Sequence, residues 1–178
     1  MALVKIAIVS PSAPSTFSPT VKKQFKAGLA ALTSLGFEYA LMPHAKDNIG
    51  YKAASVTDRL SDLHAAYADP TVDIIMAANG GWTCTQLLDG LNYELIRQSS
   101  KPLAGASDIT ALQNAIYTKT GNPQLYSPMV TWGLHNNDSQ TLQSFAALAT
   151  RDQQEWSTGD FGIWLKPGTF NEWQIWTR

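Results

Sequence analysis

The sequence predicts an α/β fold in which a mostly parallel sheet is flanked by helices. Two continuous apolar runs, 3–9 (LVKIAIV) and 72–78 (VDIIMAA), are rich in β-branched residues, which is typical of strands buried on both faces. Helical patterns alternate with such runs, and repeated strand–helix units place helices on both faces of a sheet. With 178 residues, 44% of them hydrophobic, the chain fits one ordinary domain.

Local signals justify the first elements in order. After the strand at 3–9, apolar residues at helical spacing predict a helix over 20–35 that Gly36 ends. The stretch 37–42 (FEYALM) is a second strand candidate. Ser55 then caps a helix that runs to about Tyr67, and the strand at 72–78 follows.

The later elements follow the turn Asn79-Gly80-Gly81, after which we expect a helix to begin near Cys84. A short strand lies in KPLAGA (101–106), and Ser107 or Asp108 caps the next helix. The stretch SQTLQSFAALAT looks helical, and the stretches FGIWLK and EWQIWTR look like strands.

Composition limits the classes of partner and compartment. The net charge is −1, without a basic block, which argues against nucleic acid or an anionic membrane as the main partner. No stretch approaches the roughly 18 apolar residues of a membrane span. The apolar part of the N-terminus is short and carries Lys5, so we expect a core strand there instead of a signal peptide. One cysteine cannot form an internal disulfide. We expect a cytoplasmic protein.

The turn 79–85 (NGGWTCT) is the first candidate for chemistry, because ligands of open α/β sheets bind beyond the carboxyl ends of strands. A strand–turn–helix exposes one side chain at its apex beside the N–H groups of a helix start, which lower the pKa of a thiol. This predicts Cys84 as a nucleophile. The alternative is a buried, inert cysteine.

Other residues of the two turns have a functional and a structural interpretation. The N–H groups of Gly81 and Thr85 are candidates for an oxyanion hole, or else belong to ordinary turn geometry. The side chain of Trp82 walls a substrate pocket or simply packs. Ser107 and Asp108 cap a helix, or support the active-site turn and contact substrate.

Several separate blocks resemble the LD-carboxypeptidase family of serine peptidases, which includes the microcin-immunity peptidases. They are 79–96 (NGGWTCTQLLDGLNYELI) and 101–121 (KPLAGASDITALQNAIYTKTG). Upstream, 10–15 (SPSAPS) and 59–66 with Asp69-Pro70 are also similar to the family. The resemblance covers nearly the whole chain and implies a flavodoxin-like or Rossmann-like N-terminal domain, with Cys84 at the nucleophile position.

The resemblance also implies an activity. The family hydrolyses an amide bond between an L- and a D-configured residue, such as the terminal D-alanine of a murein tetrapeptide, and relatives cleave a peptide–nucleotide antibiotic. It implies a Ser-His-Glu triad whose histidine and glutamate lie on a C-terminal domain. A murein-derived or modified peptide is therefore the expected partner.

Two departures from the family pattern matter. Cys84 replaces the serine, and the chain stops at Arg178, about where the second domain of the family begins. We therefore expect 1–178 to be a single nucleophile-bearing domain that is nearly inactive alone as a peptidase. Whether the chain is an enzyme stays open, and the alternative is a non-catalytic or degenerate peptide-binding module.

A different cysteine enzyme, such as an amidotransferase-type glutaminase, fits less well. Cys84-Thr85-Gln86 lacks the glycine that such turns favour, and no later His-x-Glu pair is present. We expect His44, His64 and His135 to have surface or packing roles. The histidines and the cysteine lack metal-ligand spacing, and Gly80-Gly81 is not a phosphate loop, so no metal and no cofactor are expected.

Four tryptophans gather late in the chain, at 156, 164, 173 and 176. In the family this region leads into the second domain, so we expect some of this aromatic surface to be exposed in this chain. An exposed apolar surface of this kind favours a homodimer, or contact with a missing C-terminal domain.

Overall fold

The computed structural model describes residues 4–99, 101–136, 139–150, 164–165 and 175–176. Its centre is a five-stranded sheet in the order β2-β1-β3-β4-β5, and all neighbouring strands are parallel. The strands are β1 (Lys5–Val9), β2 (Glu38–Leu41), β3 (Ile74–Ala77), β4 (Leu103–Gly105) and β5 (Leu125–Tyr126). The predicted α/β class with a parallel sheet is confirmed.

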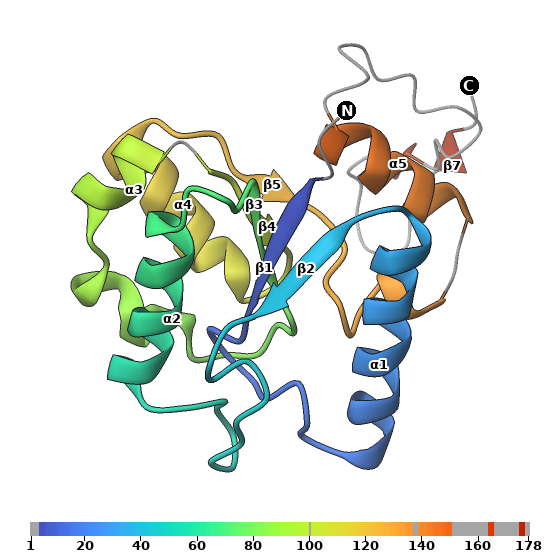
Figure 1. Ribbon diagram of the computed structural model, residues 1–178, viewed down its shortest axis with the longest axis horizontal. Helices are drawn as coiled ribbons and strands as arrows, with labels where there is room; N and C mark the ends of the chain where they lie inside the picture. Colours follow the sequence, from blue (N-terminus) through green and yellow to red (C-terminus); the bar gives the residue numbers. More distant parts are fainter. Residues whose placement is uncertain (1–3, 100, 137–138, 151–163, 166–174, 177–178) are drawn as a thin grey trace.

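Helices cover both faces of this sheet, as Figure 1 shows. One face carries α2 (Val56–Ala68), η1 (Cys84–Gly90, a 3₁₀-helix), α3 (Tyr93–Ser99) and α4 (Ile109–Thr120). The other carries α1 (Pro19–Ser34), the short 3₁₀-helix η2 (Leu134–Asn136) and α5 (Ser139–Thr150). A separate antiparallel pair joins β6 (Trp164–Leu165) to β7 (Ile175–Trp176).

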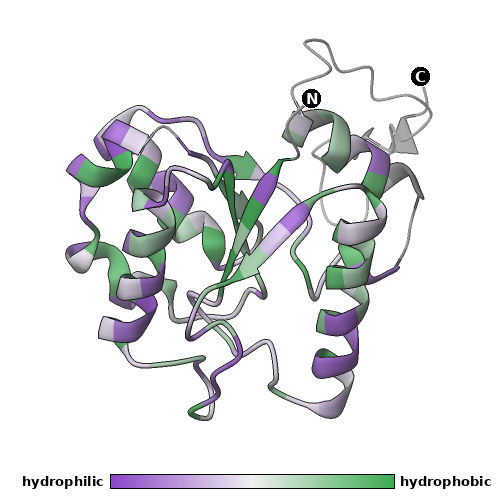
Figure 2. Cartoon of the chain, viewed as in Figure 1, coloured by the Kyte–Doolittle hydropathy of each residue, from purple (hydrophilic) through white to green (hydrophobic). Residues whose placement is uncertain are grey.

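Two hydrophobic cores result from the alternation of side chains along each strand. Ala7 and Ile75 point to the face covered by α2, α3 and α4, whereas Ile6 and Ile74 point to the face covered by α1 and α5. The central strands are therefore apolar at successive positions, and Figure 2 shows them as hydrophobic while polar residues lie on the outer helices. The continuous apolar runs in the sequence reflect this double burial.

The helix signals in the sequence also act as expected. The Ser55 hydroxyl accepts a hydrogen bond from the Asp58 N–H and donates one to the Asp58 carboxylate, so the predicted cap of α2 is confirmed. α1 begins with the Ser18 cap and Pro19, and Gly36 follows it at φ +84°.

Some of the predicted elements differ in extent. The strands are shorter than their apolar runs, and β5 was not predicted because two residues leave almost no pattern. The predicted strands 161–166 and 172–178 are described only at β6 and β7, and Trp156 and Trp173 lie outside the described residues. Within the described ranges, no helix has both the length and the apolar character needed to cross a membrane.

Close packing of α1 makes Gly28 a sensitive position. A Cβ atom at Gly28 would lie 1.9 Å from the backbone oxygen of Val130, a contact that a side-chain rotation cannot relieve. In an open helix, glycine to alanine stabilises by up to about 1 kcal/mol. We expect Gly28→Ala to lower the free energy of unfolding by about 1–3 kcal/mol instead. Urea unfolding measures this, with exposed Lys26→Ala as the control, and a more stable Gly28→Ala would contradict the packing.

Candidate functional site

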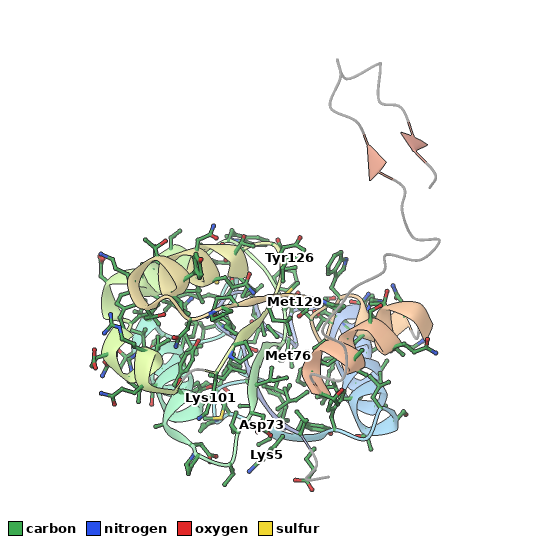
Figure 3. The ribbon with its side chains drawn as sticks, turned by 90° about the horizontal axis from the view of Figure 1, so that it is seen from above. Lys5, Asp73, Met76, Lys101, Tyr126 and Met129 are labelled. Atoms are coloured by element: carbon green, nitrogen blue, oxygen red, sulfur yellow. The ribbon has the colours of Figure 1, made fainter. Side chains whose placement is uncertain are left out.

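A pocket of about 570 Å³ opens at the carboxyl edge of the sheet. The loops after β1, β3, β4 and β5 meet there, because parallel strands all end at the same edge. In Figure 3, Lys5, Asp73 and Lys101 lie at the opposite end of the sheet from Tyr126 and Met129, which line the pocket. The full lining comprises Ala13, Phe17, Asn79, Gly80, Gly81, Trp82, Ala106, Ser107, Tyr126, Met129 and Trp132.

The lining is aromatic and contains no charged side chain. Four lining aromatics are more than half exposed, namely Phe17, Trp82, Tyr126 and Trp132. Asn79 and Ser107 are the polar side chains of the lining. An apolar pocket with few convergent polar groups is the usual form of a small-molecule or peptide site.

The Gly80-Gly81 turn packs against the loop after β1. Gly81 has φ +147°, and a Cβ atom there would lie 2.3 Å from the Ser12 Oγ and 2.7 Å from the Ala13 nitrogen. The Ala13 N–H donates to the Gly80 carbonyl at 2.9 Å. The glycines are therefore needed for contact between two loops of the chain itself, rather than only for the approach of a ligand.

Cys84 does not stand at an exposed apex, and that part of the sequence prediction is wrong. Its side chain is fully buried in the core beneath α2 and α4, and its sulfur lies 3.9 Å from the carbonyl oxygen of Pro11. Burial, and then the nearby Asp108 carboxylate, hold the pKa of the thiol well above its usual range. The exposed side chain between the glycine pair and η1 is that of Trp82.

Asp108 supports this turn instead of capping its own helix. It occupies the N-cap position of α4 but makes no side-chain capping bond there, so the predicted capping bond is wrong and the alternative, support of the neighbouring turn, agrees with the structure. Its Oδ2 accepts hydrogen bonds from the N–H groups of Thr83 at 2.8 Å and Cys84 at 2.9 Å, and from the Ser12 hydroxyl at 2.5 Å. Burial acts to raise the pKa of Asp108, but these bonds together hold it below its usual value.

Ser107 occupies the strained position of the neighbouring turn, between β4 and α4. Its φ is +57°, and it is the one non-glycine residue with a positive φ in the described part of the chain. The residue is exposed and lines the pocket, and a Cβ atom on Gly80 would lie 3.2 Å from the Ser107 Cβ. Strain at a non-glycine residue persists only where its surroundings enforce it, and it gathers at functional sites.

Sequence reasoning named Ser107 as a cap or a substrate contact and did not recognise it as the apex of a strand–turn–helix. The available signal was Gly105-Ala106-Ser107 directly after a buried strand, which matches the first half of the Gly-x-Ser-x-Gly pattern of nucleophile turns. The pattern lacks its second glycine, since Ile109 stands at that position.

Two backbone N–H groups of the two turns have no hydrogen-bond partner. Among the described residues, neither the Gly81 N–H nor the Asp108 N–H has a hydrogen-bond acceptor, and Gly81 lines the pocket beside Ser107. Thr85, the other predicted donor, is exposed on η1 and does not line the pocket. Of the predicted site residues, Gly81, Trp82 and Ser107 therefore line the pocket, whereas Cys84 and Thr85 do not.

The three histidines lie away from the pocket lining. His44 donates its N–H to Asp62 and pairs with it through Nδ1 at 2.9 Å; this hydrogen bond raises the pKa of His44 against the opposing effect of burial. His64 accepts a hydrogen bond from the Asn92 N–H, and the ring of His135 contacts Gln24. In the described ranges, no group of three or more His, Cys, Asp or Glu residues is placed to hold a metal ion.

The open parallel sheet, with an apolar pocket at its carboxyl edge, has the architecture in which α/β proteins commonly carry their ligand sites. Comparison with known proteins is more specific, since residues 6–127 match the N-terminal domain of LD-carboxypeptidases. The chain belongs to this family.

Individual relatives agree with this assignment. YocD of Bacillus subtilis is 44% identical over 162 residues, which cover 86% of this chain and 49% of YocD. The murein tetrapeptide carboxypeptidase of Pseudomonas aeruginosa is 32% identical over 128 residues, which cover 71% of this chain and 40% of that protein. The crystal structure of an MccF-like protein from Bacillus anthracis superimposes with a TM-score of 0.75 at 34% identity, covering 83% of this chain and 44% of that one. This chain thus spans half or less of the length of these relatives.

The burial of Cys84 predicts its reactivity. We expect iodoacetamide to modify the native thiol at least about 100-fold more slowly than an unfolded thiol at pH 8, because reaction needs an exposed thiolate. Mass spectrometry with and without urea measures both rates, and the folded state is verified by circular dichroism. Rapid native labelling with a thiol pKa below that of free cysteine would contradict the buried position.

The contact at Gly81 predicts a second effect. We expect Gly81→Ala to lower the free energy of unfolding by about 3 kcal/mol or more, because the new methyl group would overlap the loop after β1 in addition to straining φ. Gly36→Ala is the matched control, since Gly36 also has a positive φ but open space around it, and should cost about 1–2 kcal/mol. Equal losses in the two variants would show that the loop contact is unimportant.

Proposed function

We propose that residues 1–178 form a single nucleophile-bearing domain of an LD-carboxypeptidase, which acts on an L–D amide bond in murein-derived peptides. We further propose Ser107, in place of Cys84, as the nucleophile. The observation that carries this assignment is the strained φ of Ser107 at an exposed strand–turn–helix on the pocket wall. Its hydroxyl has no hydrogen-bond partner among the described residues, so it is open to a substrate carbonyl.

The chemistry that this position supports is acyl transfer. The Ser107 Oγ attacks the carbonyl carbon of the scissile amide, its proton passes to a base, and the carbonyl oxygen gains negative charge. The C–N bond then breaks, the amine leaves with the proton from the base, and water hydrolyses the remaining ester to free the serine. The unpartnered N–H groups of Gly81 and Asp108 support a role as oxyanion donors, because the N–H after the nucleophile and one from a neighbouring loop commonly serve together. The start of α4 adds a favourable partial positive charge.

Cys84 is the weaker candidate for the same role. A thiol acts as a nucleophile through its thiolate, and here the pKa of the thiol is raised by burial. A substrate in the pocket would also have to displace core residues to reach the sulfur, since Cys84 does not contribute to the lining.

The base is not supplied by a histidine of the pocket, because none of the three lines it. We propose that the base and its orienting carboxylate come from a further part of the protein or from another chain, since the matched relatives are at least twice as long as the matched region. In this proposal the isolated residues 1–178 bind peptide but hydrolyse it very slowly. A cytoplasmic location remains part of the proposal.

The test separates binding from chemistry. Quenching of tryptophan fluorescence by murein tetrapeptide measures binding, and Trp82→Ala should weaken it because Trp82 lines the pocket. Hydrolysis is followed as D-alanine release after adding the C-terminal half of YocD in trans. We expect Ser107→Ala to reduce release at least about 10³-fold and the matched Cys84→Ala variant to retain it.

Each outcome decides between the candidates. If Cys84→Ala abolishes D-alanine release while Ser107→Ala retains it, Cys84 and not Ser107 is the nucleophile. Peptide binding without release under any supplementation would favour the non-catalytic binding module. Absence of peptide binding would refute the proposed function.

A further inference from the structure

We propose that Arg59 is a positioning residue for Ser107, acting through a buried hydrogen-bonded chain that ends at Asp108. The inference rests on the proposed function, because it assigns a role toward the same serine. It concerns a residue near the start of α2 that is 2% exposed and does not line the pocket.

The Arg59 guanidinium ties together segments that are far apart in the sequence. Its Nη1 donates to the Pro11 carbonyl at 2.8 Å, the Thr83 hydroxyl at 3.0 Å and the Thr83 carbonyl at 3.3 Å. Its Nη2 donates to Gln86 at 2.7 Å, and its Nε donates to the Ser55 carbonyl at 3.3 Å. Every acceptor is neutral, so the charge of this buried cation is not balanced by a direct contact.

Two hydroxyl groups connect this cation to a buried anion. The Thr83 Oγ1 lies 3.3 Å from the Ser12 Oγ, and the Ser12 hydroxyl donates to the Asp108 carboxylate at 2.5 Å. The Ser12 oxygen also accepts from the Thr83 N–H at 3.1 Å. Arg59 and Asp108 therefore form a separated ion pair that is bridged by Thr83 and Ser12.

The electrostatic reason for this arrangement lies beside Ser107. A carboxylate next to an oxyanion site opposes the negative charge that develops there, and Asp108 is the residue after the proposed nucleophile. The Asp108 carboxylate donates nothing and holds the N–H groups of the neighbouring turn, so removing it would release that turn. The positive charge of Arg59 offsets the unfavourable field of Asp108 while the hydroxyl bridge keeps the geometry.

The geometric reason is the strain at Ser107. The Asp108 carboxylate is fixed by three donors on two other loops, which fixes the peptide between Ser107 and Asp108. Arg59 in turn holds both of those loops, through Pro11 and Thr83. A positive φ at serine persists only where neighbouring contacts enforce it. Arg59 contributes to these contacts indirectly, because it holds the two loops that fix Asp108.

The test uses an introduced thiol as a reporter of the field at position 107. In the Cys84→Ala background, the Ser107→Cys variant reacts with iodoacetamide across pH 5–10, which gives the pKa of the introduced thiol. We expect it below the value of about 8.5 for a free cysteine, because the N–H groups and the start of α4 favour the thiolate. Adding Arg59→Met should raise this pKa by roughly 0.5–1.

Further variants distinguish positioning from a general loss of structure. Arg59→Lys keeps the charge and should recover most of the pKa shift even if the chain is less stable. Thr83→Val removes the bridging hydroxyl at nearly constant volume and should raise the pKa in the same direction. Arg97→Met is the matched control, because Arg97 is an exposed residue of α3 that pairs with Glu94, and it should leave the pKa unchanged.

The failure of each proposal has its own signature. A reporter pKa near 8.5 before any change at Arg59 would overturn the proposed role of Ser107. A low reporter pKa that stays the same in Arg59→Met and Thr83→Val would overturn the positioning role of Arg59 and leave Ser107 intact. If Arg59→Met does not fold, Thr83→Val and Arg59→Lys decide.

Discussion

The Asp108 carboxylate is the interaction on which the carboxyl edge of the sheet depends. It accepts hydrogen bonds from the loop after β1 and from the turn after β3, while its own residue follows β4. Three of the four loops that form the pocket are thus joined at one oxygen atom. An aspartate at the start of a helix usually stabilises that helix, but here the capping interaction is given up to hold neighbouring loops in place.

A nucleophile turn usually combines glycines, a strained backbone and an exposed reactive side chain, and here these features are spread over two neighbouring turns. The turn after β3 has the glycines and an exposed tryptophan, but its cysteine points into the core. The turn after β4 has the strained backbone and a serine that faces the pocket. Contact between Gly80 and Ser107 brings the two turns together, so both contribute to one site.

Much of the fold could be predicted because its signals are local. The runs that became β1 and β3 are apolar at every position since both of their faces are buried, and Ser55 sits at a helix start with Asp58 three residues later. The position of the reactive side chain could not be predicted in the same way. The burial of Cys84 depends on packing against Pro11, which lies 73 residues earlier in the chain. The position of Ser107 depends on Gly80 and on the bond between Ser12 and Asp108, which are also distant in the sequence.

The uncharged lining of the pocket has a consequence for how the chain recognises a ligand. Salt weakens attraction between charged groups at an exposed site, and this pocket presents aromatic rings, two polar side chains and backbone N–H groups instead. Contacts made by this part of the protein are therefore nearly indifferent to ionic strength. The charges that act on the pocket are those of Asp108 and Arg59, which lie behind its wall, where salt screens them less than it would screen exposed ions.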